Sequence, residues 1–346
     1  MIALPPLSTL VAGLPDELPP TDGFWLPPAH IDLDAIALTG LMAGLYAVTV
    51  LEARRQGLTT PVGRGRLAAF TAGILVLLVG STWPIHELSE GYLFSVHMVQ
   101  HMLFMFVAAP LLLWGTPSWL MEILLAPKPV HKFVRVAAQP FVAFMIYNLG
   151  QGITHVPEIT NQILLNHTLH YLVHVYIVVS SLLLWFPIIC SLPGMPRLSY
   201  PMQMVYLMLQ SVIPTVVYAP LTYSEEVVYD FYAAAPRIWG IDPLTDQQMA
   251  GLLMKIGGGF IVWGWIAVIF FKWATRSERR ELEGDFTPLD ELRRHIDSRA
   301  HADPKALVAT ASQLLSNLTH LAGVVTVPRP QVAADRKSTR LNSSHT

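Results

Sequence analysis

The sequence predicts an all-α protein, a polytopic bundle of seven transmembrane helices. Of its 346 residues, 53% are hydrophobic and only 13% are charged, whereas a soluble domain typically has about 25% charged residues. The apolar residues also gather into seven stretches that are long enough to cross a bilayer. This composition excludes a disordered chain, a nucleic-acid-binding protein with a basic face and most soluble enzymes. The single cysteine, Cys190, excludes an intramolecular disulfide and a thiolate metal cage.

Each predicted span is a run of about 20 mostly apolar residues. In chain order, the spans are residues 32–53, 66–84, 92–114, 133–154, 167–190, 201–221 and 247–273. The first six have no Lys or Arg in their interiors, whereas buried helices of soluble proteins rarely repeat at this length without a charged face. The seventh contains Lys255, for which two interpretations stay open. Either Lys255 has a functional role, paired with an outer acid such as Asp246, or its side chain extends to the membrane surface.

Basic residues between the predicted spans indicate the orientation of the bundle. They fall on one side, at Arg54, Arg55, Arg64, Arg66, Lys128, Lys132, Arg135, Arg197, Lys272, Arg276, Arg279 and Arg280. The opposite side has Arg237 as its single Lys or Arg. Because cytoplasmic loops carry the excess of Lys and Arg, we expect the N-terminus outside and the C-terminus in the cytoplasm.

The chain divides into four parts by composition. Residues 1–30 form an extracytoplasmic segment without the basic start of a cleavable signal peptide, and residues 31–274 form the seven-helix membrane domain. Residues 275–335 are a charged cytoplasmic tail, with an amphipathic helix expected over 304–322. Residues 336–346 (RKSTRLNSSHT) fit nothing before them, and we expect them to be a non-native, adaptor-like addition.

The histidines are the most informative residues of the sequence. Eight of the 13 are placed in the outer half of the predicted membrane domain: His30, His86, His97, His101, His155, His167, His170 and His174. His97 and His101 are four residues apart and share one face of the third span, and His167, His170 and His174 share one face of the fifth. His155 closes the fourth span on the same side. These spacings predict that imidazoles from three helices meet at one depth.

A cluster of imidazoles at this depth predicts a metal site. Imidazole binds copper, zinc, iron or nickel, and thioether ligands favour Cu(I). Met98 and Met102 adjoin the two histidines of the third span, and we expect neither acids nor thiols to enter the cluster deeply. We therefore predict a copper site, with Cu(I) favoured, formed by His97, His101, His155, His170 and His174 with Met98 and Met102 as soft ligands.

Three alternatives remain open from the residues alone. The histidines can serve as hydrogen-bonding groups between helices without a metal. Alternatively, His101 and His174 can hold a haem axially in a membrane redox or haem-handling protein. A small-solute permease is the third alternative, but such proteins typically contain an internal repeat, and the sequence contains none.

Four stretches of the sequence resemble a known family. His97-Met98-Val99-Gln100-His101-Met102, continuing to Ala109-Pro110-Leu111-Leu112 and Gly115-Thr116-Pro117, is similar to the polytopic CtaG family of cytochrome c oxidase assembly factors. Three further stretches agree with the same family: His155-Val156-Pro157, His170 to His174 leading into Leu184-Trp185-Phe186-Pro187, and Asp246-Gln247-Gln248 continuing through Gly251 to Met254. The resemblance covers about residues 32–273 and departs at Val173, where the family often has an acid.

The resemblance implies a function in the assembly of a haem–copper oxidase. The protein is then not an enzyme, and it handles copper for the buried copper centre of the oxidase. The implied location is the cell membrane of a bacterium. The implied partners are oxidase subunits or other assembly factors, together with the lipid bilayer and without nucleic acid.

Overall fold

The structure, a computed structural model, describes residues 24–57, 61–190 and 192–299, and side chains up to residue 278. All the regular secondary structure in these ranges is helical, which confirms the predicted all-α class. The chain divides into two compact units, Met1–Trp273 and Ala274–Thr346. The predicted helix over 304–322, the adaptor-like residues 336–346 and most of segment 1–30 lie outside the described residues.

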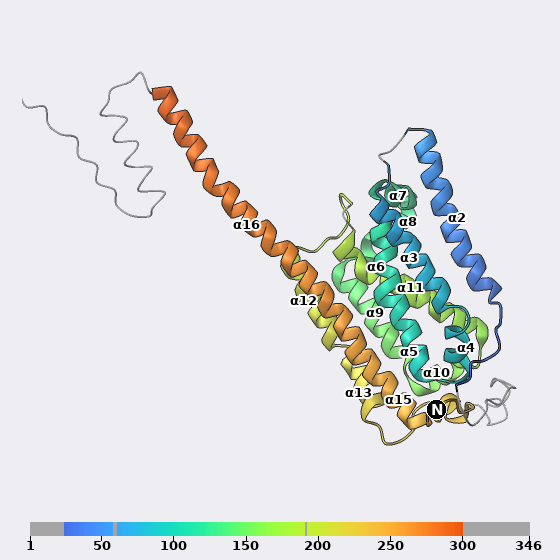
Figure 1. Ribbon diagram of the computed structural model, residues 1–346. Helices are drawn as coiled ribbons and strands as arrows, with labels where there is room; N and C mark the ends of the chain where they lie inside the picture. Colours follow the sequence, from blue (N-terminus) through green and yellow to red (C-terminus); the bar gives the residue numbers. More distant parts are fainter. Residues whose placement is uncertain (1–23, 58–60, 191, 300–346) are drawn as a thin grey trace, which may run out of the picture. The chain divides into compact units, whose positions relative to one another are not determined.

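The described helices form a bundle whose main helices are labelled in Figure 1. They are α2 (Leu33–Arg55), α3 (Arg64–Gly80), α4 (Ile85–Gly91), α5 (Phe94–Met102), the π-helical segment η1 (Leu103–Ala108), α6 (Ala109–Gly115), α7 (Ser118–Leu124), α8 (Lys128–Ala137), α9 (Pro140–Thr154), α10 (Pro157–Leu164), α11 (His167–Ile189), α12 (Tyr200–Val212), α13 (Thr215–Tyr223), α14 (Asp230–Ala234), α15 (Pro243–Leu252), the π-helical segment η2 (Leu253–Gly257) and α16 (Gly258–Arg299). In the bundle, α3 packs against α6, and α11 packs against α6 and α9.

Five to seven of these segments are candidate membrane spans. Five are long and apolar enough on their own: Leu33–Arg55, Phe94–Gly115, His167–Ile189, Tyr200–Tyr223 and Pro243–Glu278. Two more segments are long and apolar enough when a bent pair of helices counts as one span. These pairs are α3 with α4 and α8 with α9. The predicted positions of the spans therefore agree with the structure, and two of the seven are bent.

The fourth predicted span, residues 133–154, is not one straight helix. α8 ends at Ala137 and α9 begins at Pro140, and their axes differ by 78°. The break follows from Pro140, because a residue that precedes proline is pushed out of the helical region of backbone space. Gln139 accordingly has an extended backbone with ψ of 135°. Residues 133–137 thus belong to a separate helix.

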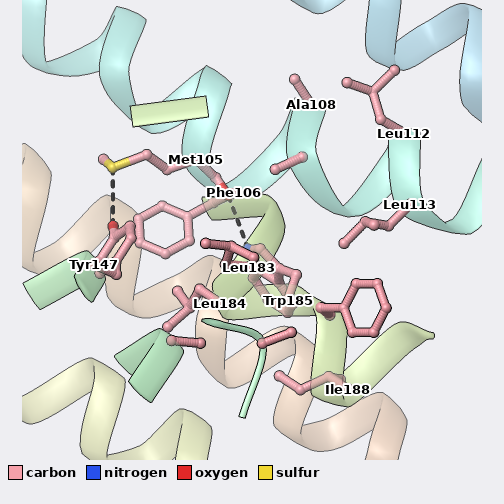
Figure 2. Packing of buried hydrophobic residues seen from close by; sticks show 14 of the residues in the cluster. Met105, Phe106, Ala108, Leu112, Leu113, Tyr147, Leu183, Leu184, Trp185 and Ile188 are labelled. Carbon is pink, nitrogen blue, oxygen red and sulfur yellow. Dashed lines mark hydrogen bonds between the residues drawn. The ribbon is translucent and has the colours of Figure 1, made fainter. Parts of the chain in front are cut away.

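Met105 belongs to the largest apolar core (Figure 2). The Tyr147 hydroxyl donates a hydrogen bond to Met105 Sδ at 2.9 Å, and Trp185 Nε1 donates to the Met105 carbonyl oxygen at 2.9 Å. Met105 belongs to η1, where the wider π-helical turn replaces the regular α-helical hydrogen bonds. Side chains of α9 and α11 therefore satisfy polar groups of the irregular segment that continues α5.

Candidate metal centre

Four of the five predicted histidine ligands converge in the structure. α5 contributes His97 and His101, and α11 contributes His170 and His174. One ring nitrogen of each histidine lies within 4.8 Å of the other three. The rings of His97 and His101 have centroids 4.2 Å apart, and those of His170 and His174 are 4.4 Å apart. We call these four residues the histidine cluster.

The helix starts fix the depth of the histidine cluster. Asp246 of α15 accepts hydrogen bonds from the backbone N–H groups of Phe94 at 2.6 Å and Ser95 at 3.0 Å, so it caps α5. The Asn166 side chain caps α11 by accepting from Leu169 N at 3.0 Å. His101 and His174 each follow two turns later. The two capped helices therefore bring their i, i+4 histidine pairs to the same level.

The Asp246 carboxylate is not paired with Lys255, so that suggested pairing is wrong. Lys255 Nζ instead donates hydrogen bonds to Thr215 Oγ1 at 2.7 Å and to the Ser211 carbonyl oxygen at 3.2 Å. Lys255 is exposed and lies in η2, between α15 and α16. The structure therefore places Lys255 against α12 and α13, away from the acid that caps α5.

Several ring nitrogens of the histidine cluster are buried and lack a hydrogen-bond partner among the described residues. They are His97 Nδ1, both nitrogens of His101, His170 Nε2 and His174 Nε2. Buried polar atoms are normally paired, because an unpaired one costs about 1–3 kcal/mol. One ring nitrogen of each histidine lies close to the other three, and a cation bound among them would accept one lone pair from each ring. The donor set therefore fits a transition-metal ion.

A partly exposed carboxylate contacts the histidine cluster, whereas we predicted that no acid enters the cluster deeply. Glu90 Oε1 of α4 lies 3.0 Å from His170 Nδ1 and 3.3 Å from His86 Nε2. With its proton on Nδ1, His170 donates to Glu90 and leaves Nε2 free to bind a metal. In the sequence, the i, i+4 spacing of His86 and Glu90 indicates that these two side chains share a helix face, and this was the one hint that Glu90 lies beside a histidine.

The other three predicted ligands lie around the histidine cluster. His155 and Met98 line a cavity of about 20 Å³ together with His97, His101 and His170. This volume is about the space that one water molecule or ion needs. His155 Nδ1 is 2.7 Å from the Gln151 carbonyl oxygen, and its buried Nε2 has no partner among the described residues. The Met102 side chain lies against the backbone of Gly257 in η2.

The geometry of the rings disfavours an axially bound haem. An iron held between two imidazoles, with bonds of about 2 Å, separates the ring centroids by about 6 Å. The centroids of His101 and His174 are 5.2 Å apart, and the rings meet edge to face. The cavity beside His97, His101 and His170 holds about 20 Å³, and a separate cavity of about 270 Å³ is lined by His174 together with His86 and Glu90. Haem is therefore disfavoured by the arrangement of the His101 and His174 rings, which leaves no place for an iron held between them.

Comparisons with known proteins agree with the resemblance stated above. The model of the family described as cytochrome c oxidase caa3 assembly factor (Caa3_CtaG) matches residues 44–276. An uncharacterized protein of Mycobacterium leprae is 24% identical over 282 residues, which is 76% of this chain and 41% of that protein. Uncharacterized proteins of Mycobacterium bovis and Mycobacterium tuberculosis are each 26% identical over 279 residues, which is 73% of this chain and 39% of each. The chain thus spans about two fifths of the length of these curated relatives, and no solved structure matches it.

We predict that Glu90→Ala weakens binding of a transition metal to the purified protein by about 10- to 100-fold, because groups that orient a metal-binding histidine contribute about that much. A titration with a competing chelator measures the affinity. Glu87→Ala is the matched control, since Glu87 lies on α4 and makes no ion pair or hydrogen bond with the four histidines in the described structure. Equal affinities of the Glu90 variant and the wild type would show that the contact does not orient a ligand.

Proposed function

The chain belongs to the cytochrome c oxidase caa3 assembly factor family, and we propose that it binds copper in the membrane and delivers it to a haem–copper oxidase. The observation that carries this proposal is the buried histidine cluster of α5 and α11. Family membership supports a role in assembly, and the cluster supplies a place for the copper ion. Copper is then cargo, and the protein is not an enzyme.

The charge of the site favours Cu(I) over a divalent ion. The four imidazoles are neutral ligands, and Glu90 is the carboxylate in contact with the histidine cluster within the described part of the chain. A single positive charge balances this carboxylate, whereas a divalent ion leaves one positive charge uncompensated in an apolar interior. The nearby thioether of Met98 adds to the preference for Cu(I).

The arrangement of the seven predicted residues supports a holding site with an adjoining transfer position. His97, His101, His170 and His174 hold the ion in this proposal. His155 and Met98 receive it in the adjoining cavity, because both line that cavity beside three of the four ligands. Met102 packs against Gly257 and takes part only if the side chain rotates.

We propose that copper enters from the outer face of a bacterial membrane. α5 and α11 both begin near the histidine cluster, so the cluster lies at the end of the bundle where these two helices start. The basic residues Lys128, Lys132 and Arg135 belong to α8, in the connection that follows α6 and α7. Under the positive-inside rule, this connection is cytoplasmic and the histidine cluster is near the outer surface.

Cu(I) binding by the purified protein tests the site directly. We expect His101→Ala and His174→Ala each to lower the affinity at least tenfold, since each removes one of the converging ring nitrogens. A Cu(I) titration against a chelator gives the values. His131→Ala is the control, because His131 is an exposed histidine of α8. Wild-type affinity in both cluster variants would refute the proposed ligand set.

The role in assembly predicts a specific defect in the client oxidase. Deletion of the gene should yield an oxidase that retains its haem and lacks copper, and wild-type protein should restore the copper where His101→Ala protein should not. Metal and haem analysis of the purified oxidase measures both. A normal copper content in the deletion strain would contradict the proposed function.

A further inference from the structure

α8 has two opposite faces of different chemistry. Lys128, His131, Lys132 and Arg135 follow the i, i+3, i+4, i+7 spacing of one helical face, and all four are exposed. The same spacing places Val130, Phe133, Val134 and Ala137 on the opposite face. The ten residues of α8 contain no acid. The helix is therefore strictly amphipathic, with a purely basic polar face.

Only part of the apolar face is covered by protein. Ala137 is buried, and Val134 packs against the main core. Phe133 is 64% exposed and Val130 is 40% exposed, so these two side chains of the apolar face have little cover in the described structure. In water such exposure is unfavourable, whereas at a membrane surface these side chains enter the boundary of the acyl chains.

The direction of α8 matches a position in the plane of the membrane surface. α9 is apolar and forms the part of the fourth candidate span that follows the bend. A helix at 78° to α9 runs nearly parallel to the surface if α9 crosses the bilayer. The basic face of α8 then points to the headgroups while Phe133 and Val130 point to the acyl chains.

From these three observations we propose that α8 is an interfacial helix that binds the headgroups of anionic phospholipids. The basic side chains supply the charge complementarity, and the uncovered apolar side chains supply the contact with the bilayer. The lipid would anchor the start of α9, which carries Tyr147 and Gln151 in contact with Met105. This inference is independent of the metal proposed above.

Lipid binding by the detergent-purified full-length chain tests the proposal. Native mass spectrometry measures the apparent affinity for dihexanoyl phosphatidylglycerol and, in parallel, for the zwitterionic dihexanoyl phosphatidylcholine. We expect preference for phosphatidylglycerol in the wild type. The triple variant Lys128→Gln, Lys132→Gln, Arg135→Gln should lose roughly 100-fold in that affinity, since each basic side chain near an anionic surface contributes about fivefold.

Two further variants make the test specific. Arg54→Gln, Arg55→Gln, Arg64→Gln removes three exposed charges from the ends of α2 and α3 and should retain the affinity. Lys128→Arg, Lys132→Arg, Arg135→Lys keeps the charges of α8 and should also bind as the wild type does. An equal loss in the α2–α3 variant, or equal binding of the two lipids by the wild type, would overturn the proposal. The second result would leave an acidic protein as the partner of this surface.

Discussion

The need to pair buried imidazole nitrogens is the constraint on which the rest of the structure depends. Histidines two turns inside an apolar bundle are costly unless a partner faces them. The chain supplies one such partner, Glu90, to His170 Nδ1, and one ring nitrogen of each of the four histidines lies within 4.8 Å of the other three. A cation bound among these nitrogens removes the free-energy cost of leaving them unpaired. The arrangement that is unfavourable without a metal therefore favours metal binding.

The surrounding fold holds this arrangement by contacts between distant parts of the chain. Asp246 of α15 caps α5, and Glu90 of α4 contacts α11, so helices far apart in sequence set the positions of the two histidine pairs. Below the histidine cluster, η1 departs from regular helix, and Met105 receives hydrogen bonds from Tyr147 and Gln151 of α9 and from Trp185 of α11. Irregular turns of this kind are frequent at functional sites, because they move side chains off the regular helical spacing.

The sequence predicted the helical class and the positions of the spans, because a bilayer admits only segments that satisfy their own backbone. It also predicted which histidines share a face, since His97 with His101 and His170 with His174 follow helical spacing. The sequence did not predict the break before Pro140, because the mean hydropathy of a stretch is the same whether its helix is straight or bent. It missed Glu90, since the approach of α4 to α11 depends on the 43° bend between α3 and α4 and on tertiary packing. The placement of Lys255 against Ser211 and Thr215 was missed for the same reason.

X-ray absorption spectroscopy of the copper-loaded protein tests the central claim most directly. If the four histidines hold the ion, the first shell consists of imidazole nitrogens at about 2.0 Å. The outer-shell scattering should then be that of imidazole rings. A first shell dominated by sulfur at about 2.3 Å would contradict the account, because the ion would then lie with methionine or cysteine and not at the histidine cluster.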